Sequence, residues 1–348
     1  MSGQQAVIDF LANGAAYGTP NEPVECIESH GSLVFLHRQR AYKLKRAVSF
    51  AGLDYRSLDS RRRACLAELR LNRRTAPQLY LEVRSINRTA DGVLSFNGLG
   101  PALDWVVVMR RFPQDALFSH MAQAGQLSAG LMASLGAAIA NFHASAQIMP
   151  AFGGAAGVRL AIADNHRELR SYPQWLPATA VQALQQASYR ALDDYAETLE
   201  QRRVEGRVRR CHGDLRLANI CLFEGRPTLF DGIEFSEQIS CIDVLYDIAF
   251  VLMDLHHHDL DSLASHLLLS YLAHSSEAED CRVLPLFLSL RAATRSYALA
   301  GSATRQSDPR VAHQFAAKAR ALLRQANAYL GRDSTRVFAH LHSHCKIA

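Results

Sequence analysis

The segment 211–232 constrains this chain more than any other part of its sequence. It contains an H-x-D-x-x-x-x-N pattern that runs from His212 to Asn219. Two short apolar runs with a glycine-containing turn between them follow, and this arrangement predicts a β-hairpin. A second acid, Asp231, comes directly after the hairpin and before a glycine. Because the two strands of a hairpin run out and return, we expect Asn219 and Asp231 to lie near one another.

This spacing is typical of the catalytic loop of a phosphotransferase, and the chemistry explains why. A hydroxyl group that accepts phosphate needs a carboxylate to orient it and take its proton, and Asp214 has the position for that role. A magnesium ion that bridges the phosphates of ATP needs oxygen ligands from two directions, which Asn219 and Asp231 supply. The loop 212–219 and the hairpin 220–231 therefore predict a phosphoryl-transfer site, whereas a His-Gly-Asp triplet alone would also suit a helix N-cap.

Asp247 lies beyond the hairpin, on an otherwise apolar helical stretch. A carboxylate is costly to bury unless it accepts several hydrogen bonds. We expect Asp247 to hold the backbone of the loop 212–219 rather than to react. The alternative is an interaction with the helix dipole, which suits the nearby Asp243 better.

Hydrophobic periodicity divides the chain into two parts. The first third contains β-rich runs and one helical stretch, whereas helical periodicity dominates from about Pro113. This pattern predicts an α+β fold with two lobes, a small β-rich lobe over 1–112 and a larger helical lobe over 113–348 that carries the loop and the hairpin. The expected strands include 32–36, 41–45 and 105–109, and the expected helices cover 60–74, 131–146, 179–200 with Thr179 as N-cap, 242–255, 263–273 and 311–330. The glycine-rich run 153–157 is expected to be a mobile loop.

Lysine is rare in this chain, with 4 Lys against 34 Arg, and codon usage explains the scarcity. Two of the four, Lys43 and Lys45, stand in one expected strand and share a face with Ala41. A kinase-like site requires a β-lobe lysine that reaches the α- and β-phosphates, with an alanine two residues earlier against adenine. That argument favours Lys43 without excluding Lys45. The alternative is a pair of solvated lysines on an edge strand.

A partner acid for this lysine is expected on the following helix. Glu68 is the only acid in the stretch 61–74, so we assign it that role. The alternative for Glu68 is a local helix pair with a neighbouring arginine, worth a few tenths of a kcal/mol.

Two further N-terminal segments have positions suited to a nucleotide. A loop of small residues before the lysine strand would cover the phosphates with backbone N–H groups, although it has a single glycine. The apolar run up to Pro113, with a hinge at about 106–112, would receive adenine through backbone hydrogen bonds, or is simply a buried strand. The nucleotide-binding residues expected from these segments are Ser29, His30, Gly31, Ser32, Val108, Met109 and Arg110.

Composition narrows the class of protein. The chain has 348 residues, of which 49% are hydrophobic and 20% charged, as in ordinary globular proteins. A net charge of +5 permits a phosphate site but does not require a nucleic-acid partner. Seven cysteines without a C-x-x-C pair argue against disulfides and zinc. Neither a signal peptide nor an apolar run of membrane-spanning length is visible, so we expect a cytoplasmic protein without a membrane partner.

Several of these segments together resemble a known family. The loop 212–219, with Gly213 in place of the arginine of protein kinases, the stretch 230–235 and the Tyr246-Asp247 pair resemble the aminoglycoside phosphotransferase and choline kinase branch of the protein-kinase-like fold. The segments 41–45, 50–54, 68–74, 76–77, 79–80 and 241–243 resemble, more narrowly, a bacterial group of uncharacterised aminoglycoside-phosphotransferase-like proteins. Some members carry a second, P-loop ATPase domain. No G-x-x-x-x-G-K-[ST] motif occurs here, so this chain would be the kinase half alone.

The resemblance implies a kinase that uses ATP and Mg²⁺ to phosphorylate a hydroxyl of a small molecule. It implies Asp214 as the base, Asn219 and Asp231 as magnesium ligands, and Lys43 or Lys45 as the phosphate lysine. Arg216 stands where related small-molecule kinases often have histidine, so it is expected to contact the γ-phosphate or the acceptor. The alternatives are a nucleotide-binding regulatory pseudokinase, and a protein kinase, which the lack of an obvious A-P-E segment disfavours.

The identity of the acceptor stays open. We expect the helical lobe to build its pocket. An aminoglycoside needs a strongly acidic pocket, to which Asp254, Asp259 and Asp261 would contribute, whereas Arg291 and Arg295 would favour the opposite charge.

Overall fold

The chain forms two compact units in the computed structural model, which describes residues 4–29, 31–50, 53–277 and 281–331. One unit contains Met1–Leu117 and Cys221–Glu237, and the other contains Phe118–Ile220 and Gln238–Ala348. The first break lies five residues after the expected lobe boundary at 112. The hairpin, which we expected in the helical lobe, groups with the N-terminal unit instead, because Cys221 and Phe223 belong to the same apolar cluster as sheet residues such as Val107.

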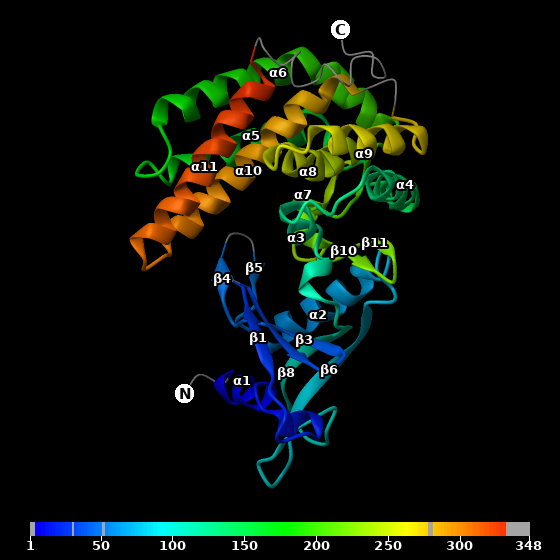
Figure 1. The fold of residues 1–348 in the computed structure, drawn as a ribbon, viewed down its shortest axis with the longest axis vertical. Helices are drawn as coiled ribbons and strands as arrows, with labels where there is room; N and C mark the ends of the chain where they lie inside the picture. The colour runs from blue at the N-terminus through cyan, green and yellow to red at the C-terminus, as the bar shows by residue number, and fades with distance from the viewer. Residues whose placement is uncertain (1–3, 30, 51–52, 278–280, 332–348) are drawn as a thin grey trace. The chain divides into compact units, whose positions relative to one another are not determined.

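The N-terminal unit is built on a six-stranded antiparallel sheet with the strand order β1-β2-β3-β8-β6-β7 (Figure 1). Its strands are β1 (Glu25–Glu28), β2 (Ser32–His37), β3 (Arg40–Lys45), β6 (Tyr80–Arg88), β7 (Leu94–Phe96) and β8 (Ala102–Arg110). Two short strands, β4 (Ser49–Phe50) and β5 (Leu53–Asp54), pair with each other. The expected strands at 32–36, 41–45 and 105–109 lie within β2, β3 and β8, and β3 is an interior strand.

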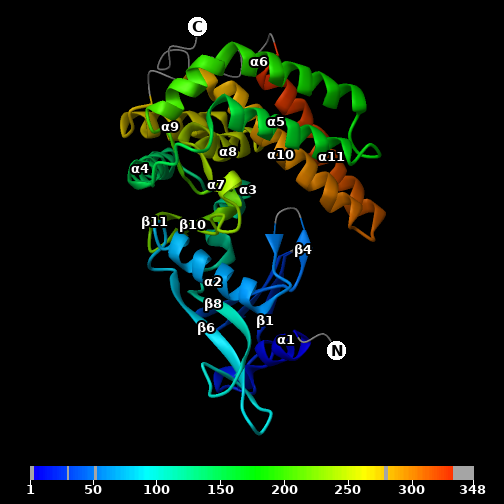
Figure 2. The same cartoon turned by 180° about the vertical axis from the view of Figure 1, so that it is seen from behind.

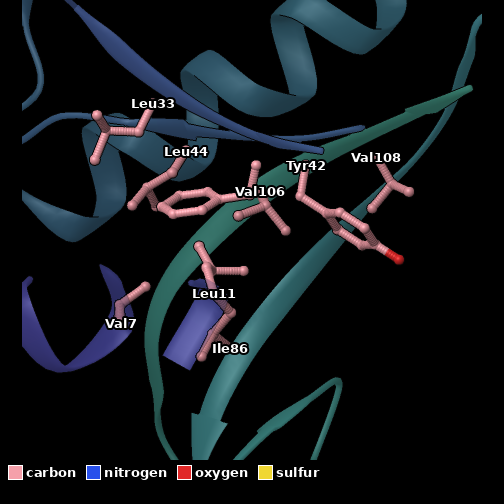
Figure 3. Close-up of a cluster of buried hydrophobic side chains, with 9 residues drawn as sticks. Val7, Leu11, Leu33, Tyr42, Leu44, Ile86, Val106 and Val108 are labelled. Carbon is pink, nitrogen blue, oxygen red and sulfur yellow. The ribbon is translucent and has the colours of Figure 1, made fainter. Parts of the chain in front are cut away.

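The side chains of β3 alternate between two differently covered faces of the sheet. On one face, Tyr42 and Leu44 join a buried apolar cluster with side chains of α1 (Gln5–Leu11), and Figure 3 shows these side chains pointing toward one another. On the other face, α2 (Leu58–Asn72) packs against β8 and β6 and meets Lys43 and Lys45. The Ser57 hydroxyl caps α2 by accepting from Ser60 N, so the helix begins two residues before the expected start.

The expected hairpin is present as β10 (Ile220–Phe223) and β11 (Arg226–Leu229). Its two turn residues, Glu224 and Gly225, have φ values of 49° and 77°. Two consecutive left-handed residues fit the twist of a tight hairpin, and Gly225 adopts this conformation without a steric penalty.

The second unit is helical. Its helices are α3 (Phe118–Gln123), α4 (Ala129–Ser145), α5 (Gly154–Arg170), α6 (Ala178–Val204), α8 (Val244–His257), α9 (Asp261–Ala273), α10 (Leu284–Thr304) and α11 (Pro309–Tyr329), with the short α7 (Glu237–Ser240) at the junction of the units. Two short strands, β9 (Val208–Arg210) and β12 (Cys241–Asp243), pair antiparallel. Single 3₁₀ turns lie at Gly14–Tyr17 and Gln114–Ala116 in the first unit and at Leu217–Asn219 and Cys281–Val283 in the second. Helices α10 and α11 run side by side, as do α5 and α6 (Figure 2).

The expected helices are present, with three local differences. Thr179 does not cap α6, because that helix begins at Ala178 directly after Pro177. The glycine run 153–157 is not a loop, since Gly154 opens α5. Ile242 belongs to β12, and Asp243 caps α8 by accepting from Leu245 N. The described cysteines are free thiols, all buried except Cys26, and none of the described helices is long and apolar enough to span a membrane.

Candidate active site

Lys43 lies on β3 between two carboxylates of the N-terminal unit. Its Nζ donates to Glu68 Oε1 at 2.8 Å and to Asp231 Oδ1 at 2.5 Å, and its side chain is 11% exposed. Burial on its own lowers the pKa of a lysine, but Asp231 and Glu68 outweigh it and raise the pKa of Lys43. The ammonium group therefore stays charged at neutral pH.

Lys45 makes a different set of contacts. Its Nζ donates to Glu234 Oε1 at 2.5 Å and pairs with Glu68, and Glu234 also accepts from the Tyr55 hydroxyl at 2.7 Å. Burial lowers the pKa of Lys45, but Glu234 and Glu68 raise it well above its usual value. Both lysines are buried on an interior strand, so they are not solvated edge lysines. Of the two, only Lys43 contacts Asp231 among the described residues.

The backbone at Asp231 is fixed by two side chains that the sequence patterns did not indicate. Asp231 has a φ of 62°, which is uncommon for a residue other than glycine. Its N–H donates to the Tyr80 hydroxyl at 3.1 Å, and the next N–H, of Gly232, donates to Asn72 Oδ1 at 2.7 Å. Asn72 follows Glu68 by one turn of α2, so one helix face holds both the lysine and the acid. That i, i+4 spacing is the one signal that would have identified Asn72.

The residues expected to cover the phosphates lie between β1 and β2 or at the start of β2. Ser29 Oγ accepts from Ser32 N at 3.1 Å and donates to Ser32 O at 3.0 Å. Arg46 N donates to Gly31 O at 2.9 Å. His30 lies outside the described residues.

The three residues expected to contact adenine lie inside strand β8. Val108 stands opposite Tyr42 on one side and Glu82 on the other, and Met109 is likewise paired on both sides. Arg110 N donates to Leu79 O at 2.9 Å. The main chain at these positions is therefore engaged by the sheet, and the segment between the expected lobes starts after Arg110.

In the helical unit, Asp214 is held by residues of its own loop. Asn219 Nδ2 donates to Asp214 Oδ2 at 2.7 Å and to Asp214 O at 2.9 Å. Arg216 Nε lies 3.0 Å from Oδ2 and 3.2 Å from Oδ1 of the same carboxylate. The side chains of Asp214 and Arg216 are 27% and 26% exposed, so the carboxylate is held firmly and still reaches solvent.

Asp247 fixes the backbone of this loop from α8. It is fully buried, and its two oxygens accept from His212 N at 3.0 Å and from Gly213 N at 2.9 Å. Gly213 has a φ of 85°, a conformation that favours glycine. His143 Nε2 lies 3.1 Å from Asp247 Oδ2, and its Nδ1 lies 3.0 Å from the Tyr271 hydroxyl. His143 and Tyr271 carried no recognisable signal, because neither belongs to a motif or a spacing that marks a site.

The electrostatics of Asp247 favour its ionised form. Burial raises the pKa of a carboxyl group, but the hydrogen bond and charge of His143, with His212 and Arg291, lower the pKa of Asp247 to about 2. Arg291 Nη1 donates to Gly213 O at 3.3 Å, and its guanidinium stacks 3.9 Å from the centre of the Tyr246 ring. Arg291 is thus part of the loop's support.

Comparison with known proteins identifies the family of this chain. The model of the phosphotransferase enzyme family matches residues 39–283, which is more than half of the chain. Uncharacterized proteins of Mycobacterium tuberculosis and Mycobacterium bovis are 28% identical over 289 residues, covering 81% of this chain and 56% of each relative. The chain therefore spans little more than half the length of these curated relatives.

Solved structures show the fold. A choline/ethanolamine kinase family protein from Mesorhizobium loti has a TM-score of 0.54 at 15% identity, covering 95% of this chain and 99% of its own. Choline kinase from Cryptosporidium parvum has a TM-score of 0.54 at 11% identity and covers 92% of both chains. A thermostable mutant of an aminoglycoside phosphotransferase has a TM-score of 0.50 at 16% identity, covering 91% and 98%. With its β-sheet N-terminal unit, helical second unit and matching family model, this chain belongs to the phosphotransferase enzyme family.

Proposed function

We propose that this protein is a kinase that uses ATP and Mg²⁺ to phosphorylate a hydroxyl group of a small molecule. The observation that carries the proposal is the position of Lys43, a charged and buried lysine shared by Glu68 and Asp231. Lys45 also pairs with two carboxylates, but both of those are buried, whereas Asp231, the partner of Lys43, is 43% exposed. A lysine that must exchange a carboxylate for nucleotide phosphates benefits from a second one that stays in place, and Glu68 supplies it because it is completely buried.

The donor atoms fit magnesium. Asp231 Oδ1 already contacts a cation, the Lys43 ammonium, and its side chain is 43% exposed. The amide nitrogen of Asn219 is engaged by Asp214, so its amide oxygen is the atom left for a metal. Both are the hard oxygen ligands that Mg²⁺ prefers. When bound, Mg²⁺ would supply positive charge that stabilises the phosphates of the nucleotide during transfer.

The remaining steps belong to the residues of this chain. Asp214 Oδ2 accepts from both Asn219 and Arg216, whereas Oδ1 has only the longer contact with Arg216. We assign Oδ1 to orient the acceptor hydroxyl and take its proton. Lys43 would bind the nucleotide phosphates while it keeps its contact with Glu68, and Asp231 would be one of the residues that hold the metal. Catalysis would thus consist of positioning and charge stabilisation.

An ADP-release assay with purified protein, Mg²⁺-ATP and a panel of hydroxyl metabolites tests this proposal. We expect turnover with at least one acceptor, its loss on chelation of Mg²⁺, and its loss in Asp214→Asn. Binding of ATP without Asp214-dependent turnover on any acceptor would support a pseudokinase instead. Absence of any Mg²⁺-ATP binding would contradict both readings.

A further inference from the structure

The charged groups near Asp214 in the helical unit indicate the chemical class of the acceptor, an inference that rests on the proposed function. We propose that the acceptor carries an anionic group, a carboxylate or a phosphate, which Arg295 and Arg216 bind while Asp214 takes the proton of its hydroxyl. This would distinguish the protein from kinases that act on cationic acceptors such as choline or an aminoglycoside.

The position of Arg295 follows from its neighbour on α10. Arg291 and Arg295 are one turn apart and lie on the same face of the helix. Arg291 contacts the backbone at Gly213 and Tyr246, so this face of α10 is turned toward the catalytic loop. Burial and the positive charge of Arg216 lower the pKa of Arg295, whereas Asp254 and Asp214 act in the opposite direction. Arg295 therefore lies among these groups.

The Arg295 side chain is half-buried in the helical unit. Among the residues that the structure describes, none forms a hydrogen bond or an ion pair with Arg295. Arg291, by comparison, donates to two backbone carbonyl groups and stacks on two aromatic rings. Arg291 therefore supports the fold through direct contacts, whereas Arg295 makes no such contact with the described residues.

The nearby acids, Asp214 and Asp254, match the two arginines in charge but are already engaged by the catalytic loop. Asp214 accepts from Asn219 and Arg216, and the Asp254 carboxylate accepts from Leu217 N at 3.0 Å. Both carboxylates thus already hold the loop. A cationic acceptor would have to bring its charge beside the Arg295 guanidinium, which none of the described carboxylates pairs directly, and this is unfavourable at short range. A carboxylate or phosphate would instead gain the planar, multidentate contacts that arginine provides.

The same guanidinium groups could also bind the phosphoryl group that is transferred. The test must therefore measure the affinity for the nucleotide and the affinity for the acceptor separately. Isothermal titration, with Mg²⁺ and a non-hydrolysable ATP analogue present, would compare five hydroxyl probes: glycerol 3-phosphate, glycerate, glycerol, ethanolamine and choline. The variants are Arg295→Gln, Arg295→Lys and Arg324→Gln. Arg324 is an exposed arginine of α11 and serves as the matched control. Thermal melting checks that each variant is folded.

We expect the two anionic probes to bind more tightly than the neutral and cationic ones. Arg295→Gln should weaken the anionic probes by about tenfold or more, Arg295→Lys by less, and Arg324→Gln not at all. The affinity for the ATP analogue should stay within about twofold in every variant. The inference is overturned if choline or ethanolamine binds best, if no anionic probe binds, or if Arg295→Gln weakens the nucleotide alone. Failure of Mg²⁺-dependent nucleotide binding in the unmodified protein would contradict the proposed function itself, which keeps the two failures distinct.

Discussion

The charged residues of the two units are stabilised in different ways. In the N-terminal unit, Lys43, Lys45, Glu68 and Glu234 are nearly inaccessible to solvent and neutralise one another. In the helical unit, Asp214 and Arg216 are partly exposed, and buried residues hold their backbone. The first arrangement fixes a charge through its side-chain partners. The second leaves the reactive carboxylate accessible and fixes only its position.

Because of this difference, substitution of a charged residue should have different consequences in the two units. Removing a buried partner in the N-terminal unit leaves an opposite charge uncompensated and should affect folding. Removing the accessible carboxylate of the helical unit should affect only the reaction.

Asp214→Asn should reduce turnover by roughly 10²- to 10⁴-fold, because the amide cannot take the proton of the acceptor hydroxyl. Binding of Mg²⁺-ATP and the melting temperature should change little, since Asp214 is partly exposed. ADP release, nucleotide titration and thermal melting measure the three quantities. The control is Asp193→Asn, whose side chain is 71% exposed. A large loss of stability in Asp214→Asn would remove the contrast between the units.

Lys45→Met should destabilise the fold by about 3 kcal/mol, because it leaves Glu234 and Glu68 buried with one cation fewer. Lys43→Met should instead mainly abolish nucleotide binding, since its partner Asp231 is partly exposed. Urea unfolding gives the free energies of unfolding. The double variant Lys45→Met/Glu234→Leu should recover part of the loss. If the double variant is as unstable as the sum of its single changes, the pair is not coupled.

Asp247 should make the free energy of unfolding depend on pH in the acid range. Its pKa is lowered to about 2 in the folded protein, against an ordinary value of 3.8. A carboxyl group whose pKa is lower in the folded protein than in the unfolded chain stabilises the fold at pH values above its unfolded pKa. That contribution is lost as the pH falls through its folded pKa. The contribution is about 2 kcal/mol above pH 4, and it disappears between about pH 4 and pH 2.

Asp247→Asn should remove this part of the acid dependence in urea unfolding measured from pH 7 to pH 3. The His143 side chain and the two loop N–H groups then face a neutral amide, so stability at pH 7 should also fall. An unchanged acid profile would show that Asp247 is not the group that titrates.

Asn72→Ala should have the smallest effect. It removes the side chain that accepts from Gly232 N and so loosens the backbone next to Asp231. We expect the Mg²⁺ concentration for half-maximal activity to rise by about tenfold, in line with the loss of a residue that orients a metal ligand. Turnover at saturating Mg²⁺ should be nearly normal. A change in turnover at saturating Mg²⁺ without a change in Mg²⁺ dependence would contradict this role.

Local patterns predicted much of the fold. The strand of Lys43 and Lys45, the hairpin and the main helices all carry a period or turn signal within one segment, and the structure contains them. The prediction that the hairpin belongs to the helical lobe was wrong. The hairpin groups with the N-terminal unit because Cys221 and Phe223 pack against the sheet, and no local sequence pattern encodes that contact.

The candidate site divides in the same way. Spacing predicted roles for Lys43 or Lys45, Asp214, Asn219 and Asp231, because the chemistry itself imposes that spacing, and these roles stay predictions. Asn72, Tyr80 and His143 were not, because each acts through a contact between segments distant in sequence. The residues expected to contact adenine, Val108 to Arg110, lie at the end of β8, and this role stays a prediction.

Calorimetric titration of ATP, with and without Mg²⁺, tests the central claim most directly when the unmodified protein is compared with Lys43→Met and Asp231→Asn. We predict that the unmodified protein binds ATP tightly only with Mg²⁺. Each variant should lose at least about tenfold in affinity, and the Mg²⁺ requirement should largely disappear in Asp231→Asn. Binding of equal strength in all three proteins, or binding that does not depend on Mg²⁺, would contradict the account.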